Sequence, residues 1–295
     1  MSVGNFDGPH LGHVRIIERL LAMARQVQGP AVVFSFDPHP SHILRPDAAP
    51  RPLCWTERKA ELLAELGVDA MVAYPTDAAF LRLEAREFFD RIICQRLAAR
   101  ALVEGPNFFF GRGRSGNIEV LRQFCAAVGV LLEVVDPVEI DGQVVSSSRV
   151  RDLVLAGQLA AARRLLVRPY RIRGRVVRGA GRGAKLGFPT ANIAGVDTLL
   201  PGCGIYAGRA FAHGAAWPAA ISLGPNPTFD EGHVKVEAHL LGYQGWLYDR
   251  TIEVDFLARL RDIKRFDSVA DLVAQMERDV SEVRRIVEEG AGNDE

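Results

Sequence analysis

Long hydrophobic runs and the features of a secretory leader are both missing from this sequence of 295 residues. No apolar stretch approaches the ~20 residues that a membrane-spanning helix needs. Residues 1–30 lack the successive charged, apolar and small-residue regions of a signal peptide. We therefore expect a soluble, cytoplasmic protein that has no membrane partner.

An excess of charge and paired cysteines are missing as well. Lys and Arg together number 36, and Asp and Glu together number 36, so the formal net charge is zero. Because nucleic-acid binders carry a basic surface, we expect no nucleic-acid partner. The four cysteines contain no CxxC pair, which disfavours a disulfide framework or a zinc ribbon. The sequence leaves a homo-oligomer open.

The first half of the chain alternates strand-like runs with segments of helical periodicity. We expect strands at residues 31–36, 69–74, 101–104 and 130–136, and helices at 11–28, 56–66, 78–99, 117–128 and 148–166. This alternation predicts parallel strands covered by helices, which is a Rossmann-like α/β domain over residues 1–166. Only residues 1–5 precede the first turn, so we expect the N-terminal strand to be truncated.

The second half, residues 167–295, consists of short β-branched runs separated by Gly, Pro and Asn turns, a pattern typical of an antiparallel sheet or barrel. Strands are expected at residues 170–177, 204–211, 219–223, 234–241 and 251–256. A long amphipathic helix is expected at 268–289, and residues 290–295 are expected to fray. The chain is thus predicted to form two domains.

A first candidate site lies in GNFDGPHLGH, residues 4–13, where His10 and His13 stand three residues apart at a predicted helix start. Helix N-termini present free N–H groups and the positive end of the helix dipole to phosphate. Two imidazoles beside them can donate to charge that develops on a phosphoryl oxygen. A helix cap with incidental histidines is the alternative that this spacing leaves open.

A second candidate is SSSRVR, residues 146–151, whose hydroxyl and guanidinium groups could hold a polyphosphate. A serine-rich cap with solvated arginines is its alternative. A zinc site built from His10, His13, His39 and His42 is disfavoured, because hydrolytic zinc sites usually need a carboxylate or a third histidine fixed beside an open position, and His39 lies between two prolines.

A third candidate begins in residues 168–185, which contain seven basic residues and no acidic one, interleaved with glycines. Such a glycine-rich segment suits a compact polyphosphate better than nucleic acid, since the flanking sequence lacks the series of aromatic residues on which single-stranded bases stack. If the next segment is extended, Thr190 and Asn192 project to one side and offer oxygen atoms to Mg²⁺. Glu237, within a strand pattern, faces either solvent or a polar site.

Together these motifs resemble the bacterial bifunctional riboflavin kinase/FMN adenylyltransferase family. The adenylyltransferase half is matched by residues 4–13, FDPHP at 36–40, GPNFFFGRGRSG at 105–116 and SSSRVR at 146–151. The kinase half is matched by RGAGRGAKLGFPTANI at 178–193, PGCGIYAG at 201–208, GPNPTF at 224–229 and VEAHLL at 236–241. The resemblance implies a nucleotidyltransferase domain followed by a six-stranded antiparallel β-barrel with a C-terminal helix.

For the N-terminal domain, the resemblance implies that the FMN phosphate attacks the α-phosphorus of ATP and expels pyrophosphate, giving FAD. His10 and His13 would stabilise charge on ATP, and Asn107 and Phe109 would border the flavin. The residues implied to bind ATP are Gly4, Asn5, Phe6, Asp7, His10, His13, Ser147, Ser148 and Arg151.

For the C-terminal domain, the resemblance implies phosphorylation of riboflavin to FMN by ATP. Glu237 would accept the proton of the ribityl 5′-hydroxyl group and, with Arg261, border the flavin. Thr190 and Asn192 would ligate Mg²⁺. The residues implied to bind ATP are Gly179, Gly181, Gly183, Lys185, Thr190 and Asn192.

Three alternatives remain at this stage. A truncated first strand would leave a riboflavin kinase with an inactive or weakened N-terminal domain. A nucleotidyltransferase that acts on another phosphate-bearing acceptor is disfavoured by the C-terminal motifs. A flavin-binding module without turnover would keep the same pockets, and it predicts no role for the carboxylate of Glu237.

Overall fold

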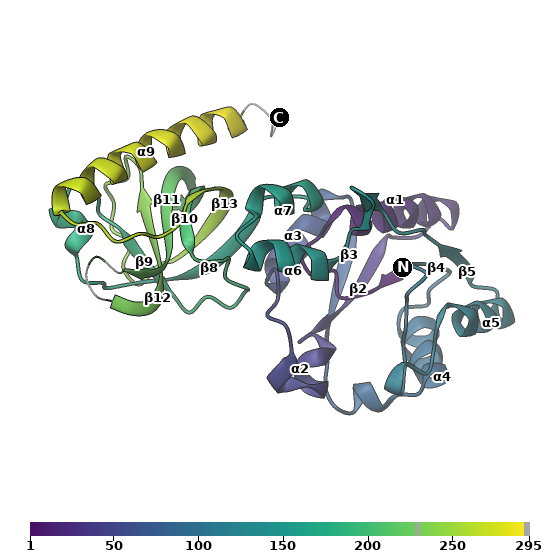
Figure 1. Ribbon diagram of the computed structural model, residues 1–295. Helices are drawn as coiled ribbons and strands as arrows, with labels where there is room; N and C mark the ends of the chain where they lie inside the picture. The colour runs from purple at the N-terminus through teal and green to yellow at the C-terminus, as the bar shows by residue number, and fades with distance from the viewer. Residues whose placement is uncertain (227, 229–230, 292–295) are drawn as a thin grey trace. The chain divides into compact units, whose positions relative to one another are not determined.

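The computed structural model describes residues 1–226, 228 and 231–291 (Figure 1). The chain forms two compact units. The N-terminal unit comprises Met1–Pro50 and Trp55–Ser147, and the C-terminal unit comprises Arg51–Cys54 and the chain from Ser148 onward. Among the described helices, none has the length and apolar character needed to cross a membrane.

The N-terminal unit is built on parallel strands. These are β1 (Ser2–Val3), β2 (Val32–Asp37), β3 (Ala70–Pro75), β4 (Ala101–Glu104) and β5 (Leu131–Val134). Strands β1, β2 and β3 pair in that order, and β4 pairs with β5. The amide of Val103 donates to the carbonyl of Met1, so the short β1 also contacts β4. The expected short first strand is thus seen as two residues that occupy the place between β2 and β4.

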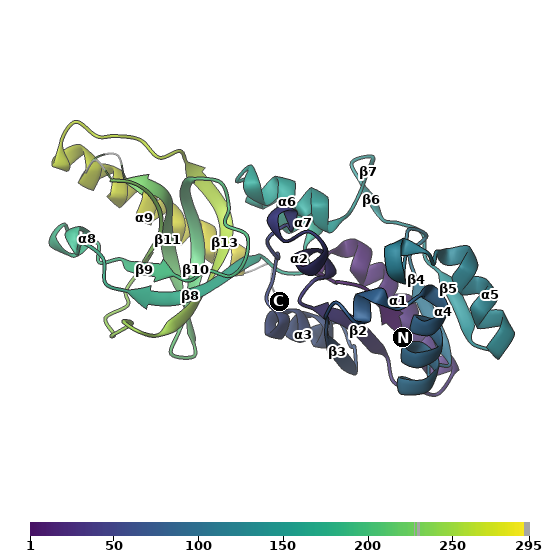
Figure 2. The same cartoon turned by 90° about the horizontal axis from the view of Figure 1, so that it is seen from below.

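Helices cover both faces of these strands (Figure 2). They are α1 (Leu11–Gln26), α2 (Pro40–Leu44), η1 (Pro46–Ala48), α3 (Thr56–Glu65), η2 (Phe80–Arg82), α4 (Ala85–Phe88), η3 (Phe89–Arg96), η4 (Arg112–Arg114) and α5 (Ile118–Val128). Val33 packs in the core with α1 and α3, whereas the next residue, Phe34, packs in the core with α4, η3 and α5. Successive strand side chains point to opposite faces, so the predicted α/β fold is confirmed.

One predicted helix of this unit is wrong. Residues 78–99 do not form a single helix but the three elements η2, α4 and η3. The chain is extended at Leu83 and Glu84, where the carbonyl of Leu83 accepts a hydrogen bond from the amide of Arg112. Glu84 then begins α4 as its N-cap, and its own amide donates to the Glu87 carboxylate. A tertiary hydrogen bond and a new cap therefore override the local periodicity.

The C-terminal unit is a closed antiparallel barrel, as predicted. Its strands are β8 (Tyr170–Val177), β9 (Ala191–Ala194), β10 (Gly204–Ala212), β11 (Ala215–Asn226), β12 (Glu231–Leu240) and β13 (Thr251–Arg261). They close in the order β10-β11-β12-β9-β8-β13. Helix α9 (Val269–Ala291) lies along the outside of the barrel (Figure 1), and its Val283 packs against Ala207 and Leu241. Strands β11 and β13 are longer than predicted. Residues 227, 229, 230 and 292–295 lie outside the described part of the chain, and with them part of the GPNPTF motif and most of the segment expected to fray.

The single helix predicted at 148–166 is also wrong. Two helices, α6 (Ser147–Leu155) and α7 (Leu159–Leu165), meet at Gly157, whose φ is +69°. A Cβ atom at Gly157 would lie 2.7 Å from the hydroxyl group of Tyr206, so both the backbone conformation and the barrel require glycine here. Several small elements were not predicted, among them the strand β9, the hairpin of β6 (Glu139–Ile140) and β7 (Gln143–Val144), and the helix α8 (Arg182–Lys185).

Candidate active sites

The first site is the turn between β1 and α1, which carries the two predicted histidines. Phe6 and Gly8 have φ values of +45° and +61°, which fold residues 4–9 back before the helix begins. His10 is the N-cap of α1, and its ring stacks on that of His13 with 3.7 Å between centroids. The backbone amide of His10 donates to Nδ1 of His13 at 3.3 Å. The proton of a neutral His13 therefore sits on Nε2, where it can be donated to a ligand.

Burial sets the charge of this histidine pair. It lowers the pKa of His10 to about 4. The pKa of His13 is also held well below its ordinary value, first by burial and then by the nearby His10 and Lys59. Both imidazoles are therefore neutral near pH 7 and act as N–H donors. Among the described residues, Nδ1 of His10 and Oδ1 of Asn5 are buried without a hydrogen-bond partner, which is typical of polar atoms that await a ligand.

Lys59 is a residue of this site that the sequence analysis missed. It is only 7% exposed, and its ammonium group donates to the hydroxyl oxygen of Ser35 at 3.0 Å. The hydroxyl of Ser35 donates in turn to the carbonyl of Asn5 at 3.1 Å. The available signal was its position on the buried face of α3, beside Leu62 and Leu63. A lysine on the apolar face of a helix needs an explanation.

The SSSRVR motif reaches the first turn through its second serine. Ser147 donates its hydroxyl hydrogen to the carbonyl of Asp7 at 2.8 Å, although the two residues are 140 positions apart in the chain. Ser148 and Arg151 belong to the C-terminal unit, where the guanidinium of Arg151 donates to the carbonyl of Arg51. The structure thus brings together Ser147 and the histidine turn, whereas the phosphate roles of Ser148 and Arg151 stay predictions.

A groove beside this turn carries the predicted flavin loop. Phe109 lines it and lies under the guanidinium of Arg114, 4.5 Å from the ring centroid. Phe108 and Phe110 stack on one another with 5.4 Å between centroids. Asn107 is exposed in the turn after β4 and is not among the lining residues. Flat aromatic surfaces with an adjacent cation suit a planar ring system.

The rival zinc hypothesis finds no support in this unit. Nδ1 of His39 accepts a hydrogen bond from the amide of Ser41 and caps the short helix α2. Within the described residues, no group of three or more His, Cys, Asp and Glu side chains lies close enough to hold a metal ion.

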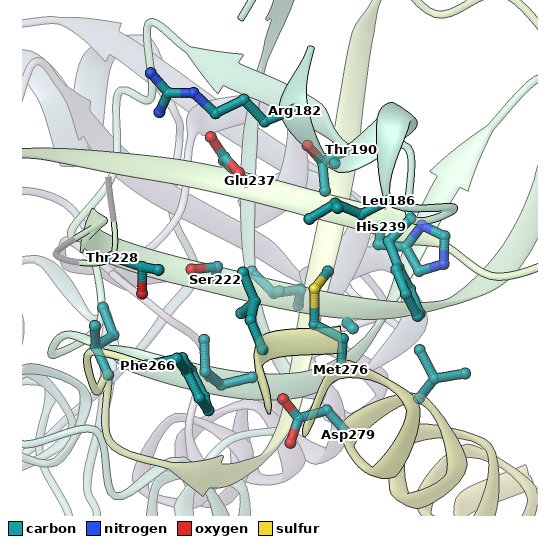
Figure 3. A pocket seen from close by; sticks show the side chains of 18 of the residues that line it. Arg182, Leu186, Thr190, Ser222, Thr228, Glu237, His239, Phe266, Met276 and Asp279 are labelled. Atoms are coloured by element: carbon teal, nitrogen blue, oxygen red, sulfur yellow. The ribbon is translucent and has the colours of Figure 1, made fainter. Parts of the chain in front are cut away.

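The second site is a pocket of the barrel that contains Glu237, Thr190 and Asn192 (Figure 3). Glu237 on β12 is paired with Asn192 on β9 and with Ser222 on β11. Directly paired residues of antiparallel strands share one face of the sheet. Figure 3 shows Glu237 and Thr190 at one end of the pocket and Phe266 at the other. The end with Glu237 and Thr190 is thus polar, and at the other end the cationic groups of Arg261 and Lys264 lie 5.8 and 4.9 Å from the centroid of the Phe266 ring.

The glycine-rich loop packs tightly against this polar end. A Cβ atom at Gly179 would lie 2.2 Å from Nδ2 of Asn192, and one at Gly183 would lie 2.4 Å from the carbonyl oxygen of Phe188. Gly181 adopts a φ of +67° and, with Gly183, lines the pocket. Lys185 is exposed and, like Gly179, is not among the lining residues. The glycines thus allow the backbone to approach the site closely.

Two further side chains shape the pocket. His239 on β12 lines it, and its Nδ1 lies 2.7 Å from the carbonyl of Pro189, the residue before Thr190. Arg261 at the end of β13 donates to both carboxylate oxygens of Asp279 on α9. The predicted flavin-side residue Arg261 is therefore engaged in holding the helix that borders the pocket. His239 was not predicted, although it stands two residues after Glu237 on the same face of the strand.

The polar end suits Mg²⁺ by its chemistry. Thr190, Asn192 and Glu237 contribute hydroxyl, amide and carboxylate oxygens to one pocket. These hard oxygen ligands are the ones that Mg²⁺ prefers, usually together with substrate phosphates. The three side chains therefore fit a metal that is delivered with a nucleotide.

Comparisons with known proteins cover both units. A family model described as FAD synthetase matches residues 1–149, and one described as riboflavin kinase matches residues 166–287. Bifunctional riboflavin kinase/FMN adenylyltransferases from Pseudomonas fluorescens and Escherichia coli K12 are 36% and 33% identical. These alignments span 97% and 95% of this chain and 92% and 90% of the relatives.

A solved structure shares the fold of the whole chain. It is described as a macrolide-efflux protein from Streptococcus pneumoniae and matches with a TM-score of 0.85 at 30% identity, covering 96% of this chain and 93% of that one. Because both family models match, the alternative of a riboflavin kinase alone is not favoured. The chain belongs to the bifunctional riboflavin kinase/FMN adenylyltransferase family.

Proposed function

We propose that this chain converts riboflavin to FMN in its C-terminal domain and FMN to FAD in its N-terminal domain, with ATP as the second substrate of both reactions. We place the domain boundary between residues 166 and 167. The observation that carries the proposal is the pocket that joins Glu237, Thr190 and Asn192, in a chain whose two halves match the two family models.

In the kinase reaction, the ribityl 5′-hydroxyl oxygen attacks the γ-phosphorus of ATP. The new oxygen–phosphorus bond forms as the bond to the β-phosphate oxygen breaks, and ADP leaves. Glu237 accepts the hydroxyl proton as a general base. The end of the pocket that contains Phe266 and Met276 receives the flavin ring. Gly181 and Gly183 allow the backbone to approach the nucleotide phosphates closely.

In the adenylyltransferase reaction, a phosphate oxygen of FMN attacks the α-phosphorus of ATP. The bond between the α-phosphorus and the bridging oxygen breaks, and pyrophosphate leaves with the electron pair. His10 and His13 donate hydrogen bonds to the phosphates, where negative charge accumulates. The aromatic loop that contains Phe109 borders the flavin ring.

Mg²⁺ is the metal that we assign to the kinase site. Thr190 and Asn192 would hold it, and when bound with ATP it would neutralise charge on the phosphates. The remaining partners are the small-molecule substrates, with no nucleic acid. Because the proposed substrates are riboflavin, FMN and ATP, we expect the protein to work in the cytoplasm.

Chromatographic separation of flavins tests the proposal. The purified chain is incubated with ATP, Mg²⁺ and either riboflavin or FMN. We expect FMN and FAD from riboflavin, and FAD from FMN. FMN alone would confine activity to the barrel and contradict the adenylyltransferase half. Tight flavin binding without conversion would support a non-catalytic module instead.

A further inference from the structure

Lys59 is a buried cation that the proposed reactions leave without a role. It lies in the first turn of α3 and is 7% exposed. Asp37 of the FDPHP motif accepts a hydrogen bond from the hydroxyl of Thr56, at 2.8 Å, which anchors the same turn of α3 to the end of β2. The tertiary structure thus fixes the first turn of α3 and, with it, the position of Lys59.

The ammonium group of Lys59 uses only part of its bonding capacity. Its recorded partner is the hydroxyl oxygen of Ser35, at 3.0 Å. Among the described residues, no carboxylate forms an ion pair with it. An ammonium group has three donors and a full positive charge, and burying it without an anion is costly. The geometry therefore indicates that an anion completes the site.

The neighbours of Lys59 show where that anion would lie. Ser35 links the lysine to the carbonyl of Asn5, in the turn before α1. The positive charge of Lys59 contributes to the low pKa of His13, so the two side chains are electrostatically coupled. Nδ1 of His10 is buried there without a partner and can donate to an anion when it carries the ring proton. One buried cation and one unsatisfied ring nitrogen thus converge on the turn between β1 and α1.

We propose that Lys59 is a phosphate-binding residue of the adenylyltransferase site, which donates a hydrogen bond to an oxygen of the ATP phosphates. This inference rests on the proposed function of the N-terminal domain. As the bond from FMN to the α-phosphorus forms and pyrophosphate leaves, Lys59 stabilises the negative charge without transferring a proton.

Replacement of Lys59 in the full-length chain tests the inference. In Lys59→Met we expect kcat/KM for ATP in FAD synthesis to fall about a hundredfold, as for loss of one charge-stabilising donor. Calorimetry with inorganic pyrophosphate as the probe should show a Kd at least tenfold weaker than that of the unchanged chain. Circular dichroism and thermal unfolding of the same sample report whether both units are folded.

Two further variants distinguish phosphate binding by Lys59 from a purely structural role of its hydrogen bond to Ser35. Lys59→Gln keeps a hydrogen-bond donor for Ser35 but removes the positive charge. It should therefore lose pyrophosphate affinity to the same extent as Lys59→Met. It also replaces Lys59→Met in the test if that variant does not fold. Ser35→Ala removes the hydrogen bond between Lys59 and Ser35 but keeps the ammonium group. It should therefore bind pyrophosphate much more tightly than either lysine variant.

Unchanged pyrophosphate affinity in Lys59→Gln would overturn the inference. The inference would also fail if Ser35→Ala lost as much pyrophosphate affinity as the two lysine variants. If the unchanged chain makes no FAD from FMN, the proposed function fails, whereas the comparison of pyrophosphate affinities still decides the role of Lys59.

Discussion

Glu237 on β12 lies directly opposite Asn192 on β9, as paired residues of adjacent antiparallel strands. Their side chains therefore share one face of the barrel wall. Thr190 lines the same pocket from just before β9. This register places the proposed base beside the proposed metal ligands, so that a hydroxyl group and a metal-bound phosphate can meet there.

Replacement of the carboxylate tests the base role. In Glu237→Gln, the side chain keeps its size but no longer accepts a proton efficiently, so the riboflavin kinase rate should fall by ~10²–10⁴-fold. Riboflavin binding, followed by quenching of flavin fluorescence, should be retained. Conversion of FMN to FAD by the same sample is the control and should continue. A kinase rate within tenfold of the original would contradict the role.

The packing of the glycine-rich loop predicts a steric effect on Asn192. In Gly179→Ala, the new Cβ would lie 2.2 Å from Nδ2 of Asn192, so one of the two must move. We expect kcat/KM for Mg-ATP in the kinase reaction to fall about 10- to 100-fold, as for disturbed metal-site partners. A double-mutant cycle with Asn192→Ala provides the check, since effects through a shared side chain are not additive. If the effects of Gly179→Ala and Asn192→Ala on kcat/KM are fully additive, Gly179→Ala does not act through Asn192.

The ion pair between Arg261 and Asp279 predicts a link between α9 and flavin binding. Asp279 is 7% exposed, so Asp279→Asn leaves a largely buried guanidinium without its counter-charge. We expect the barrel to lose roughly 3 kcal/mol of unfolding free energy, and the KM for riboflavin to rise because Met276 of α9 lines the pocket. Thermal unfolding and kinase kinetics measure the two effects.

A matched control lies on the same helix. Glu282 forms an exposed ion pair with Arg285, one turn apart on α9. Exposed pairs of this kind contribute little to stability. Glu282→Gln should therefore leave the melting temperature and the KM for riboflavin unchanged, and an effect equal to that of Asp279→Asn would remove the special role of the buried pair.

The histidine turn predicts a pH dependence of stability. Burial lowers the pKa of His10 from 6.5 to about 4, so the unfolded chain binds more protons than the folded chain between these values. The stabilising contribution is complete above about pH 6.5 and is lost as the pH falls toward 4. In His10→Asn, the unfolding free energy should depend less steeply on pH in this window, by up to about 1.4 kcal/mol per pH unit.

Urea unfolding from pH 7 to pH 4.5 measures this slope. Because the chain has three tryptophans, Trp55, Trp217 and Trp246, replacing the last two by Phe leaves Trp55 to report on the N-terminal unit. Identical slopes with and without His10 would show that its imidazole is not held neutral by the fold.

Local sequence patterns were sufficient for much of the architecture. Alternating strands and helices predicted the α/β unit, and the C-terminal β-branched runs predicted the barrel, because hydrophobic periodicity follows directly from which face of an element is buried. The motifs around His10, Thr190 and Glu237 also predicted two phosphate-handling sites. The helix predicted at 78–99 was wrong because the Arg112 amide, far along the chain, takes the carbonyl of Leu83.

Other features depend on contacts between residues that are distant in the sequence. The sequence places Lys59 on the apolar face of a helix, but only the packing of α3 beside β2 removes its ammonium group from water. Arg261 and Asp279 become partners only when α9 lies along the barrel. The residue types and their spacing thus determined the fold class and the chemistry that the chain offers. Only the tertiary structure decided which of these groups are buried from water and which of them contact one another, because burial and pairing depend on the packing of the whole chain.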